Sequence, residues 1–77
     1  MMSIHIVNHA LLRMKQRGIT RAEIRKVLGS SEARYPSKTK GRELFVRHIS
    51  GRKITVCARV RKRRTVIVSV WSDDNGG

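Results

Sequence analysis

The spacing of apolar residues changes once along this chain of 77 residues, and that change limits the folds open to it. Over residues 7–28 the apolar side chains recur at intervals of three and four residues, the period of an α-helix. Over residues 53–71 they alternate with other side chains, the period of a β-strand. Two helices followed by hairpin-linked strands predict an α+β fold, with both helices packed on one face of a three- to four-stranded antiparallel sheet.

Two short helices are predicted in the first part of the chain, at residues 8–17 and 20–29. Asn8 is a favourable N-cap residue, and Gly18 suits the left-handed position that closes a helix. Thr20 followed three residues later by Glu23 predicts a capping box at the start of the second helix. The residues expected on the buried faces are Val7, Ala10, Leu11 and Met14, then Ile24, Val27 and Leu28.

The strands are predicted at residues 33–38, 43–49, 53–60 and 65–71, with Pro36 placing the first at a sheet edge. Residues 50–52 form a hairpin loop in which Gly51 takes a positive φ. Residues 1–72 are therefore expected to form a single domain, and residues 73–77 a disordered acidic and glycine-containing tail.

Alternation in the last two strands predicts which side chains meet the helices. The expected inner set is Ile54, Val56, Ala58 and Val60 with Val66, Val68 and Val70. The opposite face is then half polar and basic, and the residues expected there are Arg47, Thr55, Cys57, Arg59, Thr65, Ser69 and Trp71. His48 belongs either to the edge of the core or to this basic face, depending on the parity of its strand.

The charge of the chain indicates its partner. Lys and Arg number 18 against 5 Asp and Glu, which gives a formal net charge of +13. Self-repulsion at this charge destabilises the compact state, and a polyanion relieves it. Nucleic acid is the expected polyanion, and an acidic protein partner is compatible with it. No apolar run approaches the length of a membrane span, so no membrane partner is expected.

Neither a metal nor a cofactor is predicted. Cys57 is the sole cysteine, and His5, His9 and His48 show no ligand spacing. The few carboxylates form no cluster of the kind that a two-metal nuclease needs. The lone cysteine also excludes an internal disulfide and fits a reducing, cytoplasmic setting.

Several motifs resemble one family of small bacterial domains. The resemblance lies in His9-Ala10, Arg13-Met14, Arg17-Gly18-Ile19-Thr20, Glu23-Ile24 and Val27-Leu28, in the hairpin from Gly51 to Val56 and in the closing strand from Val66 to Val70. Over residues 8–71 the chain thereby resembles DUF4258, a family of unknown function. The resemblance implies a domain with helices followed by a sheet, similar to the RelE-like and colicin-like ribonuclease toxins.

The candidate catalytic residues are His9, Arg13 and Arg17, which share one side of the first helix. Metal-independent RNA cleavage needs a base for the 2′-hydroxyl proton and cations for the developing phosphorane charge. Imidazole exchanges a proton near neutral pH, and forked guanidinium groups hold a phosphate. The alternative is that His9 has a structural or simple binding role.

The candidate nucleic-acid-binding residues lie in the sheet: Arg47, Arg59, Arg61, Lys62, Arg63 and Arg64. The first two are expected on the polar face, and the rest form a basic hairpin tip that contacts phosphates without reading bases. Trp71 either stacks on a base or packs in the core.

The function predicted from these residues is RNA binding with metal-independent endoribonuclease activity, as in a toxin held in check by an acidic antitoxin. Its target is RNA, free or on the ribosome. The alternative is a non-catalytic DNA- or RNA-binding module that uses the helix pair at residues 8–29, with Arg21, Arg25 and Lys26 facing a groove. A third possibility is a basic protein-interaction domain.

Overall fold

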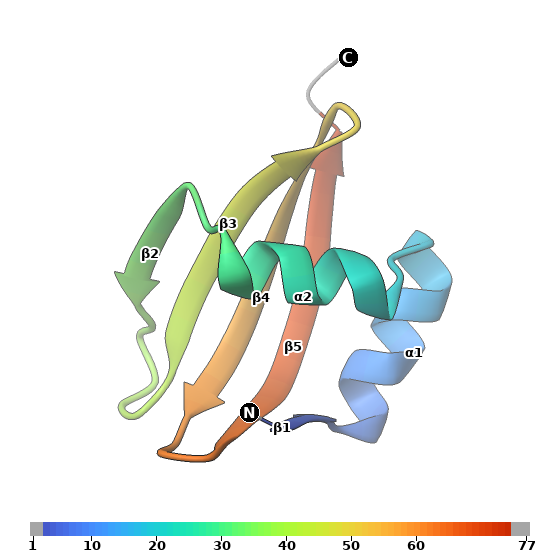
Figure 1. Cartoon of the computed structure of the whole chain (residues 1–77). Coiled ribbons are helices and arrows are strands. Elements are labelled where there is room, and N and C mark those ends of the chain that lie inside the picture. Colours follow the sequence, from blue (N-terminus) through green and yellow to red (C-terminus); the bar gives the residue numbers. More distant parts are fainter. Residues whose placement is uncertain (1–2, 75–77) are drawn as a thin grey trace.

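The computed structural model describes residues 3–74, which form two helices and a five-stranded sheet (Figure 1). The elements in chain order are β1 (Ser3–Ile6), α1 (Asn8–Arg17), α2 (Arg21–Gly29), β2 (Ala33–Pro36), β3 (Glu43–Ile49), β4 (Arg52–Val60) and β5 (Arg64–Asp74). The strand order is β1-β5-β4-β3-β2. The predicted α+β class, with both helices on the sheet, is confirmed.

The prediction of three to four antiparallel strands is wrong, because β1 adds a fifth strand that runs parallel to β5. β1 has only four residues, too few for its own alternation to distinguish a strand from the lead into a helix. Its partner residues, 64–67, lie at the far end of the chain. Only the folded sheet brings these two segments together.

The helix boundaries follow local sequence signals closely. α1 has the predicted bounds, and Gly18 ends it in the left-handed conformation with φ 67°. The capping box of α2 is present: the Glu23 backbone N–H donates to Thr20 Oγ1 at 3.2 Å, and the Thr20 N–H donates to Glu23 Oε1 at 2.9 Å. The N-cap of α1, however, is Val7 and not Asn8, and no side chain caps this end. The Val7 N–H already donates to Ile67 of β5, so the chain turns directly from β1 into the helix.

The turn between β3 and β4 is tighter than predicted. It consists of Ser50 and Gly51, with φ of 52° and 80°, while Arg52 already belongs to β4. Two consecutive positive φ values define the type of two-residue turn that matches the twist of an antiparallel hairpin. The expected positive φ at Gly51 is confirmed.

The core lies between the two helices and one face of the sheet. Ile54, Val56 and Ala58 of β4 are fully buried in it, as predicted. In β5 the predicted face is wrong, because Ile67 joins Val70 in the core whereas Val66 and Val68 remain half-buried. A register shift explains the difference: Ser69 pairs with Cys57 but Ile67 pairs with Ala58, so Val68 is an extra residue that reverses the alternation.

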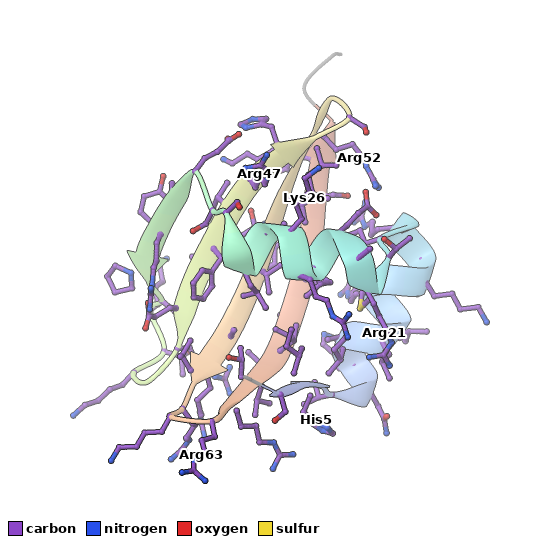
Figure 2. All side chains as sticks on the ribbon, in the orientation of Figure 1. His5, Arg21, Lys26, Arg47, Arg52 and Arg63 are labelled. Carbon is purple, nitrogen blue, oxygen red and sulfur yellow. The ribbon has the colours of Figure 1, made fainter. Side chains whose placement is uncertain are left out.

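The face of the sheet away from the helices is called here the open face. Arg47 and Thr65 were expected on it, but both lie on the helix side, since their cross-strand partners Ile54 and Val60 share the face of the core. The Arg47 guanidinium donates to the Ser30 carbonyl at 2.7 Å, next to the end of α2 (Figure 2). His48 has the opposite parity and lies on the open face, exposed.

Strand β5 is longer than predicted at its carboxyl end. Residues 73 and 74 pair with Lys53 and Arg52 of β4 and so belong to the sheet, although they were expected in a disordered tail. The backbone hydrogen bonds of an antiparallel pair extend the strand through these acidic residues. The rest of the predicted tail, residues 75–77, lies outside the described residues.

Candidate nucleic-acid interface

Cationic side chains collect at one end of the sheet, which we call the basic end. Successive antiparallel strands reverse direction, so the β2–β3 and β4–β5 connections lie at the same end (Figure 1). Together they carry Lys38, Lys40, Arg42, Arg61, Lys62, Arg63 and Arg64. The predicted basic hairpin tip is thus one half of a larger basic surface, and the other half was missed because it lies about twenty residues earlier in the chain.

Backbone hydrogen bonds hold both connections in shape. In the first, the Ser37 N–H donates to the Arg42 carbonyl at 3.0 Å. In the second, the Arg61 N–H donates to the Arg64 carbonyl at 2.8 Å, and the Ser3 N–H and hydroxyl both donate to the Arg63 carbonyl at 3.2 Å. These bonds use backbone groups of the basic residues and not their cationic ends.

The glutamates do little to offset this charge, because each is engaged by a basic partner. Arg34 forms an ion pair with Glu43, the carboxylate next to the basic end. Glu32 lies 2.7 Å from Nδ1 of His48, and Arg52 lies 3.0 Å from Glu23. The hydrogen bond from His48 holds the pKa of Glu32 below its usual value, and the hydrogen bond from Arg34 does the same for the pKa of Glu43.

The middle of the open face is formed mostly by apolar and small polar side chains and bears two partly exposed aromatic rings. Trp71 and Tyr35 are 37% and 52% exposed, and they lie on β5 and β2, on opposite sides of this region. Between them lie buried side chains of β3 and β4: Val46, Thr55 and Cys57. No described helix packs over these two rings. They are therefore available for stacking on unpaired bases.

The predicted catalytic residues lie on the other side of the molecule. His9, Arg13 and Arg17 are exposed along α1, whose buried residues Ala10 and Met14 face the core. Within residues 3–74, no side chain forms a hydrogen bond or ion pair with these three side chains. Their assignment as a catalytic set stays a prediction.

The predicted phosphate-binding residues divide between the two faces. Arg59 lies on the open face, where it pairs with Val66, while Arg47 lies on the helix side. A cavity of about 120 Å³ also lies on the helix side, between Leu28, Phe45 and Thr65. It is smaller than the roughly 300 Å³ at which ligand pockets begin.

His5 is a candidate that sequence reasoning missed. It pairs with Val66, which in turn pairs with Arg59, so His5 and Arg59 flank Val66 in one row of the open face. Ser3 and Arg64 form the neighbouring row, and Figure 2 shows His5 close to the basic end. The alternation of Ile4, His5 and Ile6 was the available signal, but it is too short to be read without the pairing partner.

The fold and surface define a small basic α+β domain with two helices on one face of a mixed sheet. The chain belongs to DUF4258, a family of unknown function, which it matches over residues 6–72. No curated protein and no solved structure matches it, and nothing in these comparisons links it to RelE-like or colicin-like toxins. Over the described residues, no helix is long and apolar enough to cross a membrane, and no three His, Cys, Asp or Glu are grouped to hold a metal ion.

Proposed function

We propose that this chain binds single-stranded RNA and acts as a metal-independent endoribonuclease of the toxin type. The observation that carries the proposal is the position of the basic end beside an open face with exposed aromatic rings. Phosphates bind the cations of the two hairpin connections, and unpaired bases stack on Trp71 and Tyr35. A duplex is a poorer fit, since its bases are already stacked on one another.

The ribonuclease part of the proposal draws on charge and on the chemistry of RNA. The neighbouring 2′-hydroxyl is an internal nucleophile, so cleavage needs proton transfer and charge stabilisation but no metal. The chain offers exposed histidines beside arginines, including the predicted set His9, Arg13 and Arg17 on α1. The proposal includes a cytoplasmic location, RNA targets free or on the ribosome, and an acidic antitoxin that neutralises the basic surface.

The binding part is tested with the intrinsic fluorescence of Trp71, the sole tryptophan. A 12-nucleotide uridine RNA with 2′-O-methyl groups, which resists this cleavage, should quench the emission on titration. The affinity should fall steeply with salt, because each phosphate contact adds roughly 0.7 to the slope of log K against log salt for a single strand. Unchanged emission together with salt-independent affinity would contradict the proposal.

Matched variants locate the surface. Lys38→Ala with Lys62→Ala should reduce the salt slope by about 1.4, one contact from each hairpin connection. The control is Arg21→Ala with Arg25→Ala, which removes the same charge from α2 and should leave the slope nearly unchanged.

The same variants test the alternative, a module that binds through the helix pair. Its supporting observation is that Arg21, Arg25 and Lys26 are all exposed on α2. In that case the α2 double variant loses binding to duplex DNA or RNA, whereas the double variant of the basic end keeps it.

A further inference from the structure

We propose that His5, Arg59 and Arg64 form the site at which the scissile phosphate of RNA binds, with His5 as the proton acceptor. This inference rests on the proposed ribonuclease function and names its reactive centre. It assigns the proton transfer to a histidine on the open face and not to His9, which lies on α1 across the sheet.

The sheet register sets the spacing of these three side chains. His5 of β1 and Arg59 of β4 each pair with Val66 of β5, and Arg64 lies two residues before Val66 on the same face. Neighbouring strands lie about 4.8 Å apart, so the Cα atoms of His5 and Arg59 are roughly 10 Å apart. An imidazole and a guanidinium extending from these positions can both contact one phosphate held above Val66.

The backbone that carries His5 is fixed at both ends. On one side, Ser3 donates two hydrogen bonds to the Arg63 carbonyl, and on the other the Val7 N–H donates to the Ile67 carbonyl at 3.1 Å. The alternate residues Ile4 and Ile6 pack against the core, which places His5 on the open face. These contacts hold the backbone of His5 in place on the open face.

The charged side chains that form this site are all basic. His5 and Arg64 are exposed and Arg59 is half-buried, and no described carboxylate bonds to any of the three. On the open face, Asp73 pairs with Lys53 at the far end of β5. At about 3.3 Å per residue it lies roughly 23 Å from Val66, beyond the screening distance of about 8 Å at physiological salt.

The reaction is an internal transesterification. The 2′-oxygen attacks phosphorus and the bond from phosphorus to the 5′-oxygen breaks, giving a 2′,3′-cyclic phosphate and a 5′-hydroxyl. His5 accepts the proton of the 2′-hydroxyl, and water supplies a proton to the leaving 5′-oxygen. Arg59 and Arg64 donate hydrogen bonds to the non-bridging oxygens, where charge develops in the transition state. His5 then releases its proton to solvent, so no oxidant, metal or second substrate is consumed.

The test is cleavage of a 12-nucleotide uridine RNA in EDTA, with chromatography of the product ends. Wild type should yield 2′,3′-cyclic phosphate ends, and His5→Ala should lower the rate at least 100-fold, the lower range for loss of a general base. Arg59→Ala should also reduce cleavage strongly, with partial recovery in Arg59→Lys. The matched control is Lys15→Ala, an exposed α1 cation outside the site, which should cleave at the wild-type rate.

The outcomes separate this site from the proposed function. Cleavage that survives His5→Ala but is lost in His9→Ala overturns the site and leaves the ribonuclease function standing. A wild type that binds RNA without cutting it overturns the site and the ribonuclease activity together but leaves RNA binding intact. A second measurement guards against misfolding: with the 2′-O-methyl RNA, the ring resonances of His5 should shift on titration, and unmoved resonances under saturating RNA overturn the site.

Discussion

The guanidinium of Arg52 lies 3.0 Å from Oε2 of Glu23 and thereby joins the start of β4 to the first turn of α2. The same guanidinium donates to the Arg17 carbonyl at 2.8 Å, at the end of α1. One side chain of the sheet therefore connects both helices. Its ion pair is largely shielded from solvent, with the side chains only 24% and 20% exposed.

Replacing Arg52 should destabilise the fold measurably. Arg52→Ala removes this ion pair and leaves a helix carbonyl without its donor, and hydrogen bonds to charged groups contribute about 1.5–3 kcal/mol each. We expect a loss of about 2–3 kcal/mol in the free energy of unfolding, measured by urea denaturation. Arg13→Ala, at an exposed position of α1, should change it by less than about 0.5 kcal/mol. Equal midpoints for the two variants would contradict a structural role for Arg52.

The stability should also depend on the protonation of Glu23. The hydrogen bond from the Thr20 N–H, together with Arg52, holds the pKa of Glu23 below its ordinary value of 4.5. A carboxyl with a lower pKa in the folded state stabilises the fold fully above pH 4.5 and loses that contribution as the pH falls through its folded pKa. Glu23→Gln should therefore be less stable than wild type at pH 7, and the difference should shrink in acid. Gln16→Ala should show a difference that is independent of pH, and the same behaviour in Glu23→Gln would contradict the prediction.

The two helix starts should respond differently to loss of their polar side chains. Thr20→Ala removes the capping interaction of α2 and should cost about 1 kcal/mol. Asn8→Ala should change the stability by less than about 0.5 kcal/mol, since no side chain caps α1. Thermal or urea unfolding of the two variants measures this contrast. A larger loss for Asn8→Ala would show that Asn8 is the N-cap after all.

The bulge at Val68 makes neighbouring residues of β5 unequal. Ile67 is fully buried in the core, so Ile67→Ala should lower the free energy of unfolding by about 2–4 kcal/mol. Val66 is half-buried on the open face, and Val66→Ala should cost about 1 kcal/mol or less. Urea denaturation distinguishes the two. The reverse order would restore the simple alternation of Val66, Val68 and Val70 and contradict the bulge.

Much of the fold could be predicted because its signals are local. The capping box of Thr20 and Glu23, the left-handed Gly18 and the turn at Gly51 depend on the backbone chemistry of adjacent residues. The buried face of β3 is ambiguous in the sequence, because neither of its alternating sets of side chains is uniformly apolar. The structure resolves it through Phe45, which is buried in the core and so turns His48 outward.

The candidate site could be predicted only in part. The hairpin tip at Arg61–Arg64 is recognisable in the sequence as a run of cations. Lys38, Lys40 and Arg42 are recognised as part of the same basic surface only because the fold places them beside that tip. His5 is a similar case, because no residue near it in the sequence indicates a role. Arg59 becomes its neighbour only through the pairing of β1, β5 and β4.

By itself, the sequence determined the net charge, the order of the two helices and the four antiparallel strands that follow them, and the helix ends marked by Gly18 and by the capping box of Thr20. These properties depend on composition and on hydrogen bonds between residues a few positions apart. The tertiary structure alone decided the parallel β1, the bulge at Val68 and the end of the sheet at which the cations meet. Those features come from pairing between segments far apart in the chain, because strand hydrogen bonds and the burial of Ile67 are available only in the assembled sheet.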